Sequence, residues 1–156
     1  MGDMNHLDEY GNAHMVDVGD KMVSRRSATA VAEITMDAET VERIFAGDTP
    51  KGDVLATVRI AAIQATKKTP DLIPLCHPLN LASVSVDIEP FDTVVRISVT
   101  ASLQGRTGVE MEAMTGAAIG AIAMYDMIKG IDRSAEVTSV RLEHKVGGRT
   151  GEWTRA

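Results

Sequence analysis

The sequence predicts an α+β fold with a ferredoxin-like core, in which helices pack on one face of a mainly antiparallel sheet. Polar and apolar residues alternate in four segments, as they do in half-buried strands. Two long helical segments and one short one lie between these strands, which gives the order β-α-α-β-β-α-β. The 156 residues suffice for a single domain with one hydrophobic core.

The chain begins with a polar segment that lacks any sustained period. Residues 1 to about 12 are therefore expected to be flexible, as is the C-terminal tail. Alternation over residues 29–36 predicts the first strand. Asp37 then begins a short helix, which ends at Gly47.

A long helix is predicted between Gly52 and Pro70, where 17 residues include neither proline nor glycine. Its β-branched residues would also suit a strand, but the segment exceeds the usual strand length. Asp53 can cap the start of this helix, and Thr69 followed by proline is expected to end it. Apolar side chains on nearly every face predict that the helix is mostly buried.

Two alternating segments, 81–90 and 93–104, predict a β-hairpin after this helix. Alternation within residues 135–146 predicts the last strand.

A second long helix is predicted between the hairpin and the last strand, over residues 109–129. Gly116 and Gly120 lie four residues apart in it, among alanines. They lower the helix propensity but allow a neighbouring backbone to come close.

Composition and charge exclude several classes of protein. The formal charge of −6 gives no electrostatic reason to expect a nucleic acid partner. The single cysteine excludes an intrachain disulfide framework and is compatible with a reducing compartment. The N-terminus lacks a basic region followed by an apolar one, and no apolar stretch is as long as a membrane span. We therefore expect a soluble, cytoplasmic protein with no membrane partner.

One carboxylate occurs in an apolar part of the second long helix. Asp126 lies within AMYDMIK, and Lys129 follows it at i+3 on the same helix face. The two residues form either a surface ion pair near a helix end or a buried acid/base pair with shifted pKa values. The sequence alone leaves both interpretations open.

Two more carboxylates, Glu110 and Glu112, lie at the other end of this helix. Acidic side chains favour a helix N-terminus without any further role. Asp126 is 14 residues beyond Glu112, so a straight helix separates them by about 21 Å. If both ends contribute to catalysis, the simpler geometry has two subunits that meet so that opposite helix ends share a pocket.

The tetrapeptide Gly-Arg-Thr-Gly occurs twice, at 105–108 and 148–151. Arg106 in the first copy precedes a helix N-terminus, where an arginine can help to hold a phosphate. Arg149 in the second copy belongs to a basic loop that follows Lys145. Neither copy matches the P-loop pattern, and ordinary turns are the simpler interpretation.

Cys76 and His77 follow the first long helix in a stretch that contains several prolines. The other three histidines are scattered, so a structural zinc site is not expected. A Cys-His dyad is not expected either, because adjacent residues of an extended segment point to opposite sides. Cys76 then suits a small buried position, which leaves His77 free to line a pocket.

Five segments together resemble one known family. They are AHMVDV at 13–18, KGDV at 51–54, VRIAAIQATKKTPDLIPLCHPL at 58–79, TGVEMEAMT at 107–115 and MYDMIK at 124–129. From about residue 13 to residue 151, the chain is similar to the cyclic pyranopterin monophosphate synthases, the MoaC family of molybdenum cofactor biosynthesis. DLIPLCHPL and TGVEMEA are its most specific motifs.

The resemblance implies a ferredoxin-like subunit in a homohexamer, a trimer of dimers with active sites at the dimer interface. It implies a phosphorus-oxygen lyase that converts (8S)-3',8-cyclo-7,8-dihydroguanosine 5'-triphosphate to cyclic pyranopterin monophosphate and releases pyrophosphate. No protein-bound cofactor or metal is expected, although a divalent cation with the triphosphate stays an open alternative. The competing interpretation is a regulatory module that binds a nucleotide without transforming it.

By motif position, the resemblance implies a catalytic group of Lys51, His77, Asp126 and Lys129. The residues expected to contact the substrate are Leu75, Cys76, His77, Glu110, Met111, Glu112, Lys67 and Lys145, with Arg106 and Arg149 as candidates for the phosphates. We expect Asp126 and Lys129 to transfer protons at the ring, Lys51 to assist and His77 to orient substrate oxygens. Clustered lysines are expected to have lowered pKa values, which would free a neutral amine to act as a base.

Overall fold

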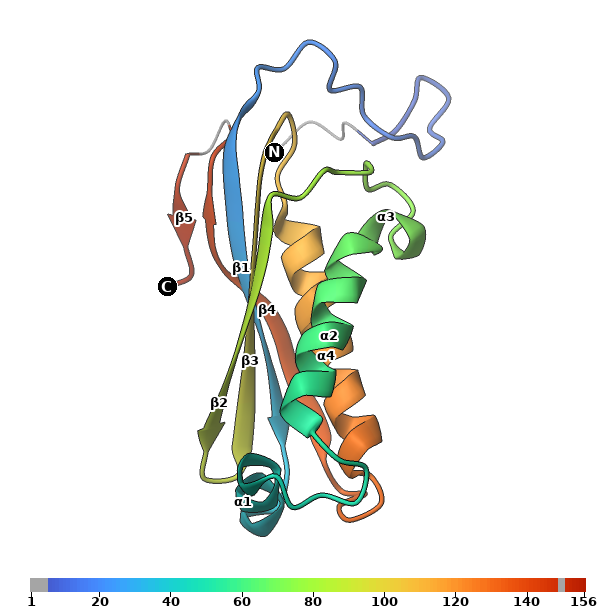
Figure 1. The fold of residues 1–156 in the computed structure, drawn as a ribbon. Helices are drawn as coiled ribbons and strands as arrows, with labels where there is room; N and C mark the ends of the chain where they lie inside the picture. Colours follow the sequence, from blue (N-terminus) through green and yellow to red (C-terminus); the bar gives the residue numbers. More distant parts are fainter. Residues whose placement is uncertain (1–5, 149–150) are drawn as a thin grey trace.

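The computed structural model describes residues 6–148 and 151–156, which form an antiparallel five-stranded sheet with two long helices on one face (Figure 1). The strands are β1 (Ser24–Thr35), β2 (Ser83–Phe91), β3 (Val94–Gly105), β4 (Glu136–Val146) and β5 (Trp153–Thr154). The helices are α1 (Ala38–Ala46), α2 (Val54–Lys67), α3 (Thr69–Leu72) and α4 (Glu110–Ile128).

The strands lie in the order β2-β3-β1-β4-β5, and all neighbours are antiparallel. The chain crosses the same face of the sheet twice, through α2 between β1 and β2 and through α4 between β3 and β4. This places β1 between β3 and β4, as in ferredoxin-like folds. The predicted fold class and the predicted order of elements are confirmed, with the short α3 and β5 as additions.

Small side chains make up much of the core between the sheet and the helices. On β1, Ala28, Ala30, Ala32 and Ile34 are fully buried, since every second residue of a strand faces the same side. α4 packs against β1, β3 and β4 over these small side chains.

The contact between α2 and α4 depends on two glycines. A Cβ atom at Gly116 would lie 2.2 Å from Oγ1 of Thr66, and one at Gly120 would lie 3.3 Å from Cβ of Ala62. α2 and α4 therefore lie closer to each other at Gly116 than a side chain at this position would allow. The predicted close approach is confirmed.

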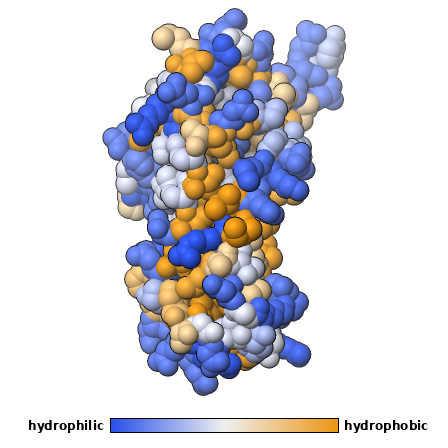
Figure 2. All heavy atoms as spheres, viewed as in Figure 1, coloured by the Kyte–Doolittle hydropathy of each residue, from blue (hydrophilic) through white to orange (hydrophobic). Residues whose placement is uncertain are grey.

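The prediction that α2 is mostly buried is wrong. Ile60 of α2 is 58% exposed and Ile122 of α4 is 56% exposed, because the rest of the chain covers only one side of each helix. Figure 2 shows hydrophobic residues at the surface down the middle of the same view. The apolar residues on nearly every side of α2 therefore do not all belong to the core of this chain.

The predicted start of α2 is confirmed, since the Asp53 side chain accepts a hydrogen bond from the Ala56 N–H at 2.9 Å. The helix ends at Lys67, as expected, but Pro70 lies in the first turn of α3 instead of stopping helical structure. Proline suits a first turn because the N–H that it lacks has no partner there.

Local structure is present at both ends of the chain. The Asp8 side chain accepts hydrogen bonds from the N–H groups of Tyr10 and Asn12. Trp153–Thr154 in the tail pair with β4. Residues 1–5 lie outside the described part of the chain.

Candidate active site

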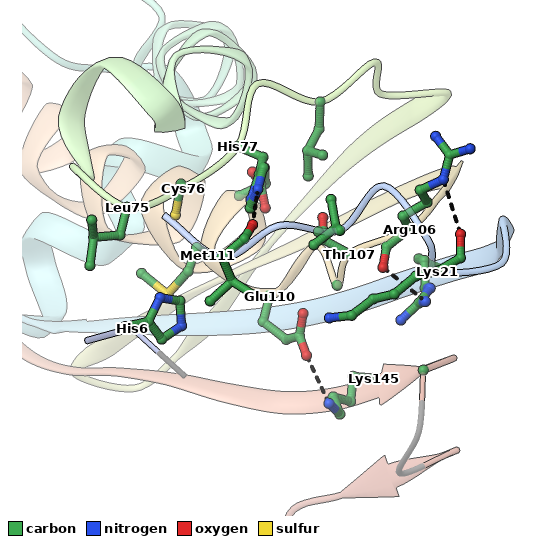
Figure 3. Close-up of a pocket in the computed structure, with 17 residues that line it drawn as sticks. His6, Lys21, Leu75, Cys76, His77, Arg106, Thr107, Glu110, Met111 and Lys145 are labelled. Carbon is green, nitrogen blue, oxygen red and sulfur yellow. Dashed lines mark hydrogen bonds and ion pairs between the residues drawn. The ribbon is translucent and has the colours of Figure 1, made fainter. Parts of the chain in front are cut away.

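A cavity of about 400 Å³ lies at the N-terminal end of α4 (Figure 3). Its walls come from the segment before β1, the segment after α3, the loop between β3 and α4, and the end of β4. Leu75, Cys76, His77 and Met111, all predicted to contact substrate, line it. Residues that the resemblance implies for substrate contact therefore lie together at one cavity.

Cys76 and His77 both line this cavity, so the expectation that they point to opposite sides is wrong. The backbone turns where an extended segment was expected, and the Cys76 N–H donates to the Ile73 carbonyl at 3.1 Å. Nε2 of His77 lies 2.8 Å from the Val16 carbonyl. Because a carbonyl can only accept, Nε2 carries the proton.

Four basic side chains line the same cavity: Lys21, Arg26, Arg106 and Lys145. Nε of Arg106 donates to the Lys21 carbonyl at 3.0 Å, and Nη2 of Arg26 donates to the Arg106 carbonyl at 3.3 Å. Nε of Arg26 is buried and has no hydrogen-bond partner among the described residues. This group of cations suits an anionic ligand such as a phosphate.

Gly147 and Gly148 close around Arg26. Their φ angles are +100° and +87°, in the region that side chains disfavour. A Cβ atom at Gly147 would lie 2.6 Å from the Arg25 carbonyl oxygen, and one at Gly148 would lie 2.6 Å from Nη1 of Arg26. The glycine turn thus confines the guanidinium at the wall of the cavity.

The two carboxylates at the start of α4 have different environments. Glu110 accepts from Nζ of Lys145 at 2.8 Å. Glu112 is only 3% exposed, and burial, with the nearby Glu110, raises its pKa. Burial and Glu112 also raise the pKa of the Cys76 thiol, so this thiol is protonated at neutral pH. The favourable interaction of a carboxylate with a helix N-terminus does not explain why Glu112 is buried, because burying a charged group costs free energy.

A second cluster of candidate residues lies at the other end of α4. Asp126 accepts from Lys51 at 2.9 Å and from Lys129 at 2.8 Å, and Lys51 also donates to the Asp126 backbone carbonyl at 2.6 Å. All three side chains are exposed. Of the two interpretations of Asp126, the exposed ion pair is the one observed, with Lys51 as an additional partner.

The protonation states in this cluster differ from those predicted. Hydrogen bonds from Lys129 and Lys51 lower the pKa of Asp126 to about 2. The bond to Asp126 raises the pKa of Lys129, so the expected lowering is wrong for this lysine. The carboxylate between the amines outweighs their mutual repulsion.

The predicted site residues therefore fall into two groups at opposite ends of α4. Lys51, Asp126 and Lys129 form one group, and the residues around His77 and Glu112 form the other. Lys67, at the exposed end of α2, is not among the residues that line the cavity. Arg149 lies outside the described residues.

Several residues that line the cavity were not predicted, among them His6, Lys21, Arg26 and Thr107. The N-terminal segment has no period from which a structure could be predicted. The signal that was present is the family segment AHMVDV, which ends three residues before Lys21.

The described residues include neither a metal-binding cluster nor a helix able to span a membrane. Within residues 6–148 and 151–156, no three His, Cys, Asp or Glu side chains are grouped so that they could hold a metal ion. No helix in the same ranges combines the length and the hydrophobicity needed to cross a membrane.

The fold is that of an α+β protein, and the basic side chains that line its cavity suit a small anionic molecule. The chain belongs to the MoaC family, whose model matches residues 15–148. It is 52% identical to the cyclic pyranopterin monophosphate synthase of Roseiflexus sp. (strain RS-1), over 98% of each chain. It is 51% identical to the protein of that name from Herpetosiphon aurantiacus, over 96% of this chain and 93% of the relative. It is 46% identical to the protein of that name from Streptomyces coelicolor, over 98% of this chain and 90% of the relative.

Proposed function

We propose that this chain is a cyclic pyranopterin monophosphate synthase that acts in molybdenum cofactor biosynthesis in the cytoplasm. It converts (8S)-3',8-cyclo-7,8-dihydroguanosine 5'-triphosphate to cyclic pyranopterin monophosphate and pyrophosphate, as a phosphorus-oxygen lyase. The observation that carries the proposal is an identity of 52% over nearly the full length with a relative of that name.

The chemistry of the cavity supports this substrate. Lys21, Arg26, Arg106 and Lys145 are placed to neutralise a triphosphate. Their charge also stabilises the pyrophosphate that leaves when a substrate hydroxyl attacks the α-phosphorus. In that step one P–O bond forms and another breaks, while the hydroxyl proton passes to a base.

The exposed cluster supports proton transfer at the ring. Asp126, with its pKa near 2, is a carboxylate at neutral pH, and Lys129 is an ammonium group. Asp126 is then the proton acceptor and Lys129 the donor as the ring opens and recloses to a pterin. Lys51 assists by holding the carboxylate.

The active site is proposed to include both ends of α4, from two subunits. About 21 Å separates Glu112 from Asp126 along the helix, too far for direct proton transfer within one pocket. The apolar surface that includes Ile60 and Ile122 suits a second copy of the chain. If α4 packs antiparallel to its copy, each Asp126 reaches the partner's cavity, and such dimers assemble into a homohexamer.

A divalent cation is proposed to enter with the triphosphate and not through a ligand set of the protein. Activity with EDTA, compared with activity in added Mg²⁺, tests this point.

The proposed function is tested by incubating the purified chain with the cyclised triphosphate. We expect pyrophosphate release and a fluorescent pterin after oxidation. Binding without either product would favour a regulatory nucleotide-binding module, and phosphate release without a pterin would indicate a phosphohydrolase.

A further inference from the structure

Residues 16–21 form one wall of the cavity and are called the strap below. Val16, Val18 and Lys21 of the strap line the cavity. A second hollow of about 510 Å³ also borders the strap and is lined in part by Val18, His77 and Arg106. Because most strap residues are exposed and hollows lie beside Val18, the position of the strap depends on the few polar contacts that it makes.

Two hydrogen bonds attach the N-terminal segment to the rest of the described chain (Figure 3). They are those from Nε2 of His77 to the Val16 carbonyl and from Nε of Arg106 to the Lys21 carbonyl. The other hydrogen bonds recorded for residues 6–23 lie within that segment. Both anchoring side chains are candidates for substrate contact. The strap and the proposed substrate therefore depend on the same two residues.

The contact with Val16 determines which hydrogen bonds His77 has left to make. Its Nε2–H is used by the strap, so in the neutral ring Nδ1 is an acceptor with a free lone pair. A histidine in this state accepts a proton or a hydrogen bond from a substrate N–H or O–H group. The expectation that His77 orients substrate oxygens is therefore met only for hydroxyl oxygens, because a carbonyl or phosphate oxygen would require a donor.

We propose that the strap is a positioning element that holds His77 as a hydrogen-bond acceptor toward the substrate and fixes the orientation of Arg106. This inference rests on the proposed function, because it assigns His77 to the substrate. The two hydrogen bonds of the strap use the backbone carbonyl groups of residues 16 and 21, which a side-chain substitution cannot remove. The proposal is therefore tested by changing the turn between these two carbonyl groups. Oδ1 of Asp17 accepts from the Gly19 N–H at 2.8 Å and shapes that turn.

Asp17→Ala removes the turn acceptor, whereas Asp17→Asn keeps an oxygen that can accept the same bond. Asp20→Ala is the matched control, because it removes one charge from the strap at a side chain that makes no hydrogen bond or ion pair with the described residues. Asp17→Ala is expected to lower kcat by between about tenfold and a hundredfold, since small misplacements of a reacting group have effects of this size. KM should rise as well, because Arg106 loses the contact that fixes its orientation, while the thermal midpoint should change little. Asp17→Asn and Asp20→Ala should behave as the unaltered chain.

A second measurement needs no substrate. The full chain, labelled with ¹⁵N-histidine, is examined by NMR, and His77 is assigned from the signal lost in His77→Gln. We expect a His77 Nε2–H proton that exchanges slowly with water in the unaltered chain and in Asp17→Asn, and quickly in Asp17→Ala.

A His77 proton on Nδ1 in the unaltered chain would overturn the proposal. Unchanged kcat in Asp17→Ala would do the same, as would equal losses in Asp17→Asn or Asp20→Ala. If the unaltered chain does not turn over the cyclised triphosphate, the proposed function fails, and the NMR measurement still decides whether the strap holds His77.

Discussion

The placement of candidate residues at both ends of α4 predicts that two inactive variants restore each other's activity. Asp126→Asn removes the carboxylate at one end, and His77→Gln removes the imidazole at the other. Each variant alone should bind substrate and lose turnover. When the two are co-expressed, a mixed dimer has one site with both changes and one site with neither.

The size of the recovery follows from this geometry. Random pairing of equal amounts makes about half of the dimers mixed, and one of the two sites in each mixed dimer is intact, so about a quarter of the unaltered activity should return. The prediction requires that His77 and Asp126 of the same chain never belong to the same active site. The distance of about 21 Å along α4 supports this, since proton transfer requires contact at about 3 Å.

Pyrophosphate release per mole of protein measures the recovery. The control pairs Asp126→Asn with Lys129→Ala, two changes in the same cluster of one chain. This pair cannot form an intact site in any dimer and should stay inactive. No recovery with His77→Gln, in mixtures shown to contain mixed assemblies, would refute the shared site.

Three other predictions concern stability and binding. Hydrogen bonds from Arg141 and Arg96 lower the pKa of Glu33 from 4.5 to about 2. Glu33→Gln should therefore cost about 2 kcal/mol of unfolding free energy at neutral pH, and this difference should disappear as the pH falls from about 4.5 to 2, as measured by urea denaturation. Gly116→Ala should cost about 2 kcal/mol through overlap with α2, whereas Gly120→Ala should stay within about 1 kcal/mol, as measured by thermal unfolding. Arg26→Gln should raise KM about tenfold and leave kcat nearly unchanged, and an unchanged KM in steady-state assays would exclude a phosphate contact there.

Periodicity was sufficient to predict the fold because each main element has a regular pattern. The alternation in β3 matches a strand with one buried face, and Asp53 caps α2 as predicted. The burial of α2 was predicted wrongly from the same kind of information. Hydrophobicity at Ile60 shows that a surface avoids water, but it does not distinguish the core of a subunit from contact with a second subunit.

The site was predictable where it follows regular elements and unpredictable where it depends on irregular ones. The i+3 spacing of Asp126 and Lys129 on a helix predicted their contact. Lys51 joins them through tertiary structure, which no local spacing encodes. Lys21 and Arg26 were missed for the same reason, since Lys21 reaches the cavity from a segment without a period and Arg26 from the first residues of β1.

The glycine turn at the wall of the cavity has a consequence for variation among related chains. Gly147 and Gly148 leave no room for a Cβ atom beside the Arg26 side chain and the Arg25 carbonyl. A relative with a larger residue at the second glycine position must therefore shorten or displace the arginine at position 26. Among aligned relatives, the first glycine should therefore vary less than the second, because its close neighbour is the Arg25 backbone carbonyl, whereas the end of the Arg26 side chain can move aside.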